Sequence, residues 1–406
     1  MKACLVCQAP IEPFISFGQT PIANGFLTPE QFASEYFFEL AVGFCSSCHM
    51  VQLLDQPDRE RMFHENYAFF SSTSTRMAEH FKAFADFVRE TYCDPVDPFV
   101  VEMGSNDGIM LRNFASRGLR HLGIEPSANV AEVARKNGVR TTCEFFDEQV
   151  ADRLGAENGP ADAICAANVM CHIPYLHSVM AGVGRLLKPK GVLIFEDPYL
   201  GDIVEKTSYD QIYDEHAFYF SVTSLTNLFD RHGFEIVDVL PQATHGGSMR
   251  YIVARKGAHA PSAAVWAQRA TERALGLGNA ETYRALAANI ERSRDALIAL
   301  LRKLKAEGKR VVGYAATSKS TTVINYCDIT SDLVEFISDT TPIKQGKFSP
   351  GRHIPVRPYE AFKASYPDYA LLFGWNHADE ILAKEQAFRE AGGQWIVYVP
   401  EVGVRV

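Results

Sequence analysis

The middle of the chain, from about residue 96 to residue 257, is predicted to fold as a doubly wound α/β domain. Segments typical of buried strands alternate there with helical segments, a pattern that favours a mostly parallel sheet with helices on both faces. The first strand also breaks into a glycine-rich turn and a helix, and ligands of such sheets bind at the carboxyl ends of the strands. We expect strands at residues 98–103, 120–124, 139–143, 162–167, 191–195, 234–239 and 250–254, and a helix from Ile109 to Ala115 or beyond.

The N-terminal segment is loop-rich and carries two cysteine pairs, Cys4-x-x-Cys7 and Cys45-x-x-Cys48. Each pair forms a knuckle, and the four thiolates together can hold one tetrahedral Zn²⁺. Four thiolates leave no open coordination position, so the metal is expected to be structural. The alternative is a redox pair, but neither motif begins a βαβ unit. The five other cysteines have no metal-like spacing and are expected to be buried thiols.

The C-terminal part is predicted to form a second, smaller doubly wound sheet. Residues 258–280 resemble a linker that runs into a helix, and an apolar stripe from Leu286 to Leu304 predicts an amphipathic helix ending at Gly308. A strand at residues 310–314 then opens the sheet. The expected domains are a zinc-binding module at 1–68, a middle domain at 69–257 that contains the first sheet, and the C-terminal domain at 258–406. Residues from about 56 to 93 are expected to be helical.

Composition limits the classes of partner. The 406-residue chain carries a net charge of −9, which argues against a general nucleic-acid or membrane-surface binder. It begins without a signal-peptide pattern, and no apolar run approaches the about 20 residues of a membrane span. We therefore expect a cytoplasmic protein, and a monomer, because no coiled coil or obvious edge strand calls for a partner.

The glycine-rich turn after the first strand predicts the cofactor. It spans Gly104 to Gly108, and Glu125 follows at the tip of the second strand, where an acid can hold a ribose diol. The turn lacks the third glycine of a dinucleotide fingerprint, and the Asp107 carboxylate would repel a pyrophosphate. A phosphate-free donor with a sulfonium, S-adenosylmethionine, suits these residues better than a nicotinamide dinucleotide. The expected cofactor-binding residues are Glu102, Gly104, Asn106, Asp107, Gly108, Glu125 and Asn168, the last at a later strand end.

Several motifs in order resemble one family across almost the whole chain. Besides the cysteine knuckles, they are Glu-x-Gly-Ser-Asn-Asp-Gly at 102–108, Gly-Ile-Glu-Pro-Ser at 123–127, Asn-Val-x-x-His-Ile-Pro at 168–174, Ile-Tyr-Asp-Glu-His-Ala-Phe-Tyr-Phe-Ser at 212–221, His-Gly-Gly-Ser-Met-Arg at 245–250 and Gly-Tyr-x-Ala-x-x-Lys at 313–319. The chain resembles the S-adenosylmethionine-dependent sugar C-methyltransferases, which act on nucleotide-linked 4-keto-deoxysugars, such as the dTDP-sugar 3-C-methyltransferases of the D-tetronitrose type. The resemblance implies a class I methyltransferase core between a zinc module and a Rossmann-like C-terminal domain.

The resemblance also implies the catalytic residues. It makes His216 the general base and matches Glu215, Tyr213, His172 and Tyr67 to other active-site positions. Carbon methylation needs a carbanion equivalent, and a histidine can remove a proton beside a ketone at neutral pH. An adjacent carboxylate can orient the imidazole, and the tyrosines or His172 can donate hydrogen bonds to the enolate oxygen. From the residues alone, each of these side chains could instead be structural.

Four further residues are candidates for substrate binding. Ser318 and Lys319 lie in a turn that nearly spells a phosphate loop, with Ser318 where that motif requires glycine, and the hydroxyls and lysine suit a diphosphate. Ser320 stands where the family usually has glycine, which leaves that contact open. Asp339 ends the second strand of the same domain, and Arg250 either reaches substrate or ends a hairpin. An inherited dinucleotide turn without ligand contacts is the alternative.

Three other functions stay open at this stage. The same motifs are compatible with a sugar O- or N-methyltransferase. The C-terminal sheet is also compatible with an NAD-linked sugar oxidoreductase. A zinc-dependent nucleic-acid scaffold is disfavoured by the net charge of −9 and by the few basic residues near Cys45 and Cys48.

Overall fold

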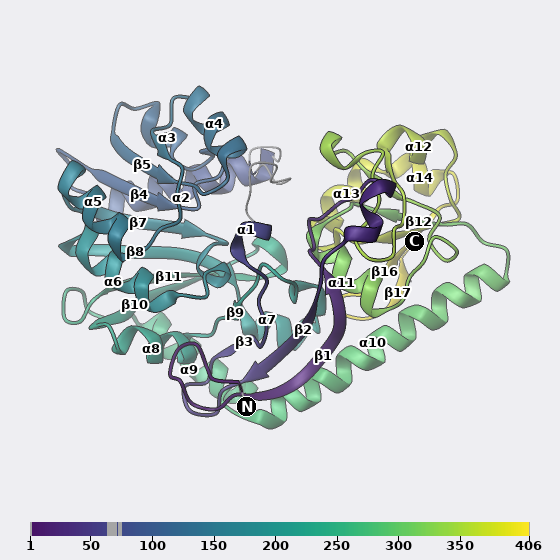
Figure 1. The fold of residues 1–406 in the computed structure, drawn as a ribbon, viewed down its shortest axis with the longest axis horizontal. Helices are drawn as coiled ribbons and strands as arrows, with labels where there is room; N and C mark the ends of the chain where they lie inside the picture. Colours follow the sequence, from purple (N-terminus) through teal and green to yellow (C-terminus); the bar gives the residue numbers. More distant parts are fainter. Residues whose placement is uncertain (1, 63–70, 72–74, 406) are drawn as a thin grey trace.

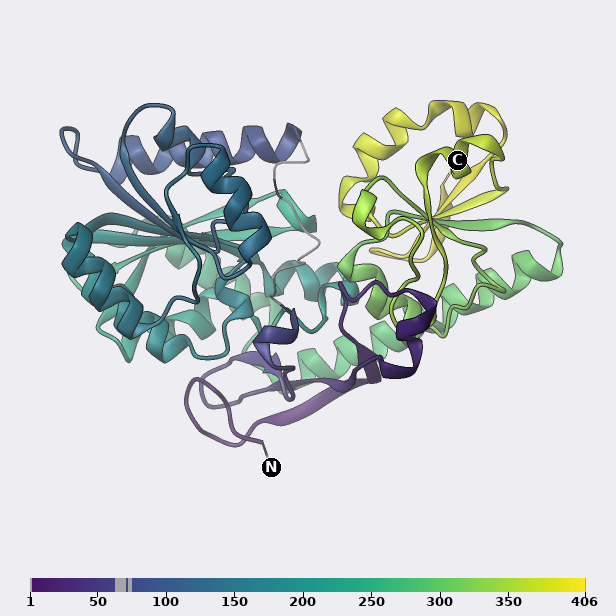
Figure 2. The same cartoon turned by 45° about the horizontal axis from the view of Figure 1, so that its top comes forward.

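The computed structural model describes residues 2–62, 71 and 75–405. Two α/β lobes stand side by side, and the N-terminal strands cross beneath and between them (Figure 1). Turning the molecule shows the same three parts, with the N-terminal sheet at the base of both lobes (Figure 2). Each part has its own sheet.

The middle sheet has the predicted doubly wound topology. Its strands are β4 (Phe99–Met103), β5 (Arg120–Ile124), β6 (Thr141–Thr142), β7 (Ala161–Ala167), β8 (Leu187–Pro198), β10 (Phe234–Gln242) and β11 (Ser248–Arg255). They lie in the order β10-β11-β8-β7-β4-β5-β6, and β11 is antiparallel to both neighbours while the other pairings are parallel. The strand order reverses between β4 and β7, which makes that edge the expected ligand site. Each of the seven expected strands is present.

The helices of this lobe are α2 (Thr75–Tyr92), α3 (Arg112–Ala115), α4 (Ala128–Lys136), α5 (Glu148–Asn158), α6 (Leu176–Leu186), α7 (Leu200–Lys206) and α8 (Val222–Asp230). The helix after the glycine turn is shorter than expected, because residues 109–111 stay in the turn. Ile109, Met110 and Leu111 are each at most 2% exposed, so three consecutive side chains are buried and no single helical face accounts for them.

The C-terminal lobe is a second parallel sheet with the order β14-β13-β12-β15-β16-β17. Its strands are β12 (Val311–Tyr314), β13 (Ile337–Asp339), β14 (Val356–Pro358), β15 (Tyr369–Leu372), β16 (Gln394–Val397) and the antiparallel β17 (Gly403–Arg405), and its helices are α11 (Ser318–Tyr326), α12 (Tyr359–Ala364), α13 (Ala378–Lys384) and α14 (Gln386–Glu390). Numbered within the lobe, this order is 3-2-1-4-5-6, the order of a dinucleotide-binding sheet. The Rossmann-like expectation for this lobe is confirmed.

The N-terminal sheet contains one strand that comes from the middle of the chain. Strands β1 (Glu12–Pro21), β2 (Phe37–Phe44) and β3 (Val51–Leu53) form an antiparallel meander, and β9 (Phe218–Tyr219) pairs with β3. A short helix, α1 (Arg59–Met62), follows β3. The segment at residues 217–219 is therefore held by the zinc module.

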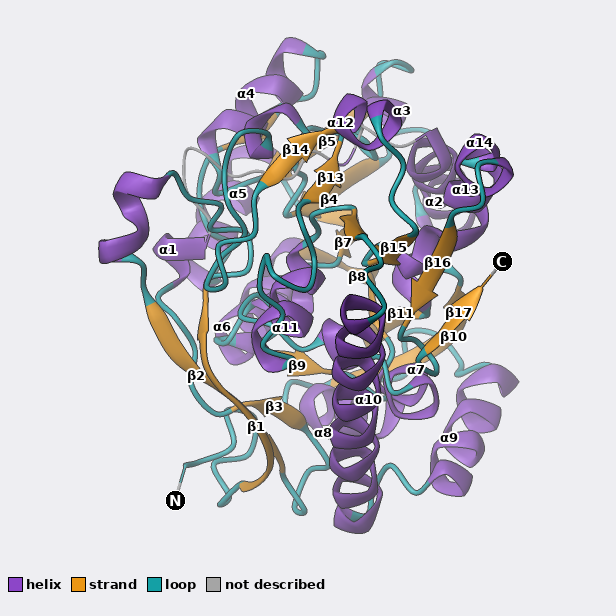
Figure 3. Ribbon diagram, turned by 90° about the vertical axis from the view of Figure 1, so that its right-hand side faces the viewer, coloured by secondary structure: helices purple, strands orange, loops and turns teal. Residues whose placement is uncertain are grey.

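Two helices join the lobes. The 27-residue α10 (Ala280–Ala306) is the expected amphipathic helix, and it runs from the N-terminal sheet along the C-terminal lobe (Figure 1). It packs against β1 and β12, and Figure 3 shows it as the long helix at the centre of the view. The segment expected as a linker contains α9 (Ala263–Leu275), which packs against β10 and α8. Glu272 of α9 accepts hydrogen bonds from the N–H groups of Val222 and Thr223 at the start of α8. The expected domain boundary at residue 257 remains a prediction, and by its contacts α9 accompanies the middle sheet.

The buried cores cross the expected boundaries. The cysteine knuckles share an apolar cluster with the middle sheet. The N-terminal strands share another with α10 and the C-terminal sheet, where the Phe44 and Tyr283 rings lie 4.5 Å apart. Among the described helices, none is long and apolar enough to cross a membrane.

Candidate active site

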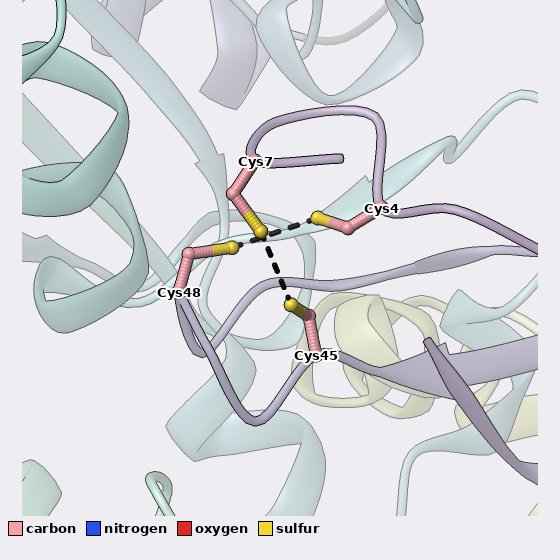
Figure 4. Close-up of side chains that lie close together, drawn as sticks. All are labelled: Cys4, Cys7, Cys45 and Cys48. Carbon is pink, nitrogen blue, oxygen red and sulfur yellow. Dashed lines mark hydrogen bonds between the residues drawn. The ribbon is translucent and has the colours of Figure 1, made fainter. Parts of the chain in front are cut away.

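The four cysteines of the two knuckles converge on one point (Figure 4). The sulfur atoms of Cys4 and Cys48 lie 3.5 Å apart, and those of Cys7 and Cys45 lie 3.4 Å apart. Tetrahedral Zn²⁺ with bonds of about 2.3 Å separates its sulfur ligands by about 3.8 Å, so the thiols fit the metal with little movement. The hydrogen bond with Cys48 lowers the pKa of Cys4 to about 5, although burial acts in the opposite direction. The set of four thiolates suits a closed, structural zinc site.

The backbone of the glycine turn has positive φ at both of its glycines, a conformation that other residues rarely adopt. Gly104 has φ of +62°, and a Cβ there would lie 2.3 Å from Cγ2 of Val169. Gly108 has φ of +80°, and a Cβ there would lie 2.8 Å from Cγ2 of Val139. The chain's own packing and the positive φ therefore require glycine at both positions.

Three carboxylates surround this turn. Glu125 accepts hydrogen bonds from the N–H groups of Asn106, at 2.9 Å, and Ser127, at 2.8 Å, so it ties the tips of β4 and β5 together. Glu102 is 2% exposed, and its Oε2 has no hydrogen-bond partner among the described residues. Burial, followed by the charges of Asp107 and Glu125, raises the pKa of Glu102 well above its usual value. Such a buried acidic turn suits a cationic ligand and disfavours a pyrophosphate.

Asn168, the cofactor candidate after β7, links this turn to the far lobe. It has φ of +56°, its N–H donates to the Glu196 carbonyl at 2.7 Å, and its Nδ2 lies 3.0 Å from Nε2 of His245. The backbone oxygen of His245 in turn accepts a hydrogen bond from Nζ of Lys319 at 3.2 Å. A chain of contacts therefore runs from the middle sheet to the C-terminal lobe.

The predicted base lies in a cluster of rings. His216 is 3% exposed, its ring centroid lies 5.2 Å from that of His172 and 4.2 Å from that of Tyr213. Its Nδ1 lies 2.7 Å from the carbonyl oxygen of Gln211. A carbonyl accepts only, so Nδ1 carries the proton and donates it, which leaves Nε2 with its lone pair. The structure therefore brings together three of the five predicted catalytic side chains.

Glu215, the fourth, accepts a hydrogen bond from Nδ2 of Asn24 at 2.7 Å. We expected an adjacent carboxylate to orient the imidazole, and in the structure the Gln211 carbonyl fills that position. Asp214 accepts from the Ala23 N–H at 2.9 Å. The zinc module thus fixes both acids that precede His216. Tyr67, the fifth predicted catalytic residue, lies outside the described residues.

Burial sets the protonation states of the two histidines. It lowers the pKa of His172 to about 3, and together with the nearby His172 and Lys319 it lowers the pKa of His216 well below its usual value. Both imidazoles are neutral at pH 7, which is the form that accepts a proton. Burial and the neighbouring Glu215 raise the pKa of Asp214 to about 8.

A cavity of about 270 Å³ opens beside this cluster. It is lined by His172, Tyr175 and Asp214 together with residues 56–60 at and before α1. The Arg59 guanidinium lies 5.1 Å from the centre of the Tyr175 ring at its wall. Small ligands therefore have a hollow next to the histidines.

In the C-terminal lobe, Asp339 repeats the geometry of Glu125. It ends the second strand, and it accepts hydrogen bonds from the N–H of Ala316 in the first turn and from the N–H of Thr341 two residues on, both at 2.7 Å. Ser318 is the first residue of α11, whose N-cap Thr317 accepts a hydrogen bond from the Ser320 N–H. Lys319 is buried, and burial lowers its pKa to about 8 against the opposing charge of Asp210.

Arg250, the remaining candidate for substrate binding, is buried, and its guanidinium is bonded to other residues of the protein. Its Nε donates to Oε1 of Glu196 at 2.6 Å, directly across from it in the β11–β8 pairing, and its guanidinium lies 4.0 Å from the centre of the Phe84 ring. Oε2 of the same Glu196 lies 2.7 Å from Nε2 of His80. These contacts attach α2 to the sheet, so they give Arg250 a structural task.

Several residues of the site were missed from the sequence. They are Gln211, Asn24, His245, Asp210 and Trp375, which act through backbone atoms or through contacts between lobes. Only His245 carried a signal, because it begins the His-Gly-Gly motif. Gly246 of that motif has φ of +88°, and a Cβ there would lie 2.2 Å from the Trp375 ring.

The strand order, the acidic turn at its switch point and the absence of a pyrophosphate fingerprint define an S-adenosylmethionine-dependent methyltransferase, here with a zinc module attached. Family models agree with this class. A "Putative zinc binding domain" matches residues 4–63, a "Methyltransferase domain" matches 71–239, and a "C-methyltransferase C-terminal domain" matches 243–400.

Individual proteins extend the comparison. The chain is 36% identical over 389 residues to the C-methyltransferase NovU of Streptomyces niveus. This match covers 95% of this chain and 92% of that protein. The S-adenosylmethionine-dependent methyltransferase of Anabaena variabilis is 18% identical with a TM-score of 0.34, over 43% of this chain and 84% of that one. The magnesium protoporphyrin IX methyltransferase ChlM of Synechocystis, solved with bound S-adenosylhomocysteine, is 16% identical with a TM-score of 0.33, over 44% and 83%.

The chain belongs to the C-methyltransferase family that includes NovU. It is an enzyme that uses S-adenosylmethionine to methylate carbon, and its cysteine knuckles form a structural zinc site. The expected family, fold class, enzyme class and cofactors are confirmed.

Proposed function

We propose that the enzyme methylates C3 of a nucleotide-linked 4-keto-deoxysugar, with dTDP as the expected nucleotide, and that His216 is the base. The observation that carries this proposal is the state of His216, a neutral, buried imidazole whose Nδ1–H is committed to Gln211 and whose Nε2 is left to accept a proton. A base of this kind is required to make a carbon nucleophile beside a ketone.

The proton chemistry follows from the cluster. Nε2 of His216 takes the proton from C3, and the electron pair of that C–H bond moves into the ring, which places negative charge on the oxygen at C4. His172 and Tyr213 surround His216 and supply hydrogen-bond donors for that oxygen. The imidazolium that forms is stabilised by its hydrogen bond to the Gln211 carbonyl.

S-adenosylmethionine supplies the electrophilic methyl group, and its C–S bond breaks as the new C–C bond forms, leaving S-adenosylhomocysteine. Glu102, Asp107 and Glu125 of the turn hold the cationic donor, and Asn168 lies at the neighbouring strand end. The turn positions donor and acceptor, which is the main source of rate in such a transfer.

The nucleotide is proposed to lie between the lobes. Lys319 reaches from α11 to the His245 loop, and Ser318 opens the same helix, so an ammonium and helix N–H groups are available to a diphosphate. Asp339 has the same position in its sheet as Glu125 has in the middle sheet, which supports a ribose contact.

Two measurements test the proposal. Mass spectrometry of reactions with dTDP-, UDP- and GDP-linked 4-keto-deoxysugars identifies the accepted nucleotide and the mass gain of one methyl group. Incubation in D₂O with S-adenosylhomocysteine in place of the donor should introduce deuterium at C3, because proton removal precedes transfer.

His216→Asn is expected to lower both exchange and methyl transfer by roughly 10²–10⁴-fold while cofactor binding stays intact. His232→Asn, at a histidine on the outside of the middle lobe, serves as the matched control. Full exchange in the His216 variant would remove this residue from the role of base.

A further inference from the structure

We propose that Cys171, His172 and His216 form a second metal site, which binds one borderline-soft divalent cation such as Zn²⁺ and thereby switches the enzyme off. The three side chains each offer one ligand atom, and these atoms lie within 4.8 Å of one another. The metal-binding half of the proposal stands on this geometry alone. The inhibitory half rests on the proposed role of His216 as base.

The distances suit a small closure around a metal. Tetrahedral zinc with bonds of about 2.0–2.3 Å separates its ligand atoms by about 3.3–3.8 Å, so the three atoms need to move by about 1 Å. Cys171 and His172 are neighbours on the short turn Met170–His172 after β7, and His216 faces them from the segment that leads into β9.

The surroundings already resemble those of a metal site. His216 donates Nδ1–H to a backbone carbonyl, the contact by which metal-bound histidines are usually oriented, and this leaves Nε2 as its available ligand atom. Asp197 accepts a hydrogen bond from the Cys171 N–H at 3.2 Å and also contacts the thiol.

The site differs in kind from the cysteine knuckles. It has three protein ligands and therefore leaves a fourth position for water, and the cavity that His172 lines gives solvent a way to it. Binding replaces the proton of the Cys171 thiol by the cation and releases that proton to solvent, with no change of oxidation state. The Nε2 lone pair of His216 is then bonded to the metal and cannot accept a proton from substrate.

Cobalt provides a test that does not depend on activity. Enzyme with zinc in its knuckles is titrated with Co²⁺, and one further equivalent is expected to bind, with d–d absorption and a thiolate-to-cobalt charge-transfer band. Cys171→Ser should abolish that band and His216→Asn should weaken binding by at least about 10-fold. In parallel, Zn²⁺ should inhibit methyl transfer, and Cys171→Ser should require at least about 10-fold more Zn²⁺ while its basal activity stays close to that of the unmodified enzyme.

Two variants control for other ligands. Cys143→Ser removes a thiol that is exposed, so the expectation of a buried thiol was wrong for this residue. His232→Asn breaks a surface pair in which Nε2 of His232 lies 2.8 Å from Nδ1 of His177. Neither change should alter the band or the inhibition.

Failure of each half is distinguishable. If no further equivalent of Co²⁺ binds, or if the band survives in Cys171→Ser, the metal site is wrong and the proposed function stands. If the metal binds through Cys171 and His216 but methyl transfer continues unchanged, the inhibitory half is wrong. The proposed base is overturned by a separate result, full deuterium exchange in His216→Asn.

Discussion

Glu102 has the most unusual electrostatic surroundings among the residues of the cofactor turn. It is almost completely buried, it faces two other carboxylates, and its Oε2 lacks a hydrogen-bond partner among the described residues. A buried carboxylate in this state is stabilised by a cation. The positive charge that distinguishes S-adenosylmethionine from S-adenosylhomocysteine is therefore expected to be recognised here.

Replacing Glu102 by Gln tests that role. The variant should bind S-adenosylhomocysteine nearly normally and lose roughly 10-fold in its preference for the cationic donor, which corresponds to about 1.4 kcal/mol. Isothermal calorimetry with both ligands measures the ratio, and Glu132→Gln on the outer surface of α4 is the control. An unchanged ratio would show that the charge is recognised elsewhere.

The raised pKa of Glu102 also predicts a direction for pH dependence. In the free protein this carboxyl holds its proton to higher pH than an ordinary glutamate, and a bound cation favours the charged form. Donor binding therefore releases protons, and affinity rises as pH increases toward the raised pKa. Calorimetry in two buffers of different ionisation enthalpy counts the protons, and Glu102→Gln should release fewer.

Sequence reasoning at this scale succeeded where spacing along the chain determines position. The turn glycines and Glu125 follow from a strand, a turn and the next strand end. Gln211 and Asn24 were missed because their roles come from contacts formed only in the folded chain, one through a backbone oxygen and the other across 191 residues of sequence.

Among the secondary-structure elements, the short strand β9 connects the zinc module to the catalytic segment. Val51 of β3 pairs with Tyr219, and the Leu53 N–H donates to the Ala217 carbonyl at 2.9 Å, one residue after His216. The second knuckle, Cys45 to Cys48, lies between β2 and β3. We therefore expect zinc to stabilise the position of His216, the proposed base, without contacting it.

Loss of zinc should therefore reduce stability and activity together. Cys48→Ser is expected to lower the free energy of unfolding by about 4 kcal/mol or more and to lower kcat, while Cys143→Ser, at an exposed thiol, changes neither. Zinc content, urea denaturation and methyl transfer are measured on the same samples. A zinc-free variant with normal kcat would contradict this link.

Asp210 forms the corresponding connection to the C-terminal lobe. Its Oδ2 accepts hydrogen bonds from Nε1 of Trp375 at 2.6 Å and from the Tyr398 hydroxyl at 2.9 Å. Trp375→Phe should destabilise the protein by about 1–3 kcal/mol, because a buried carboxylate loses a donor. Trp266→Phe, at a side chain that is 59% exposed, should leave the urea midpoint unchanged.

Element prediction was strongest for the parallel sheets and weakest between units. All seven middle strands follow from apolar runs between turns, because such strands are buried on both faces. Strand β9 has two residues and no periodicity to detect. Helix α9 has one apolar side, but its many alanines and its position between two sheets led us to expect a linker there. Its contacts with α8 and β10, which the sequence does not reveal, attach it to the middle sheet.

At the scale of the whole molecule, residues 209–219 form the segment that all three parts of the chain contact. The N-terminal module holds Asp214, Glu215 and β9, the C-terminal lobe holds Asp210, and Oγ1 of Thr322 in α11 donates to the Ile212 carbonyl at 2.6 Å. The sequence predicts three units from their separate patterns. It does not predict that one segment belongs to all three, because that arrangement depends on long-range packing.

The charge of Lys319 is expected to make binding of the nucleotide sugar depend on pH. Burial lowers its pKa to about 8 from an ordinary value of 10.5, so the free enzyme loses the ammonium charge as pH rises through about 8. If the ammonium binds the diphosphate, kcat/KM for the nucleotide sugar falls above that pH. Lys319→Met should raise KM and remove this alkaline limb, whereas Lys303→Met on the exposed side of α10 should keep it.

A second measurement separates binding from structure. Because the folded pKa of Lys319 lies below the unfolded value, the unfolded chain binds more protons between about pH 8 and 10.5, and this lysine makes folding stability rise with pH across that window. Urea denaturation should show that rise weakened in Lys319→Met, independently of any substrate. If the stability profile changes as expected but the alkaline limb of kcat/KM persists, Lys319 is buried as described and the diphosphate is bound by other groups.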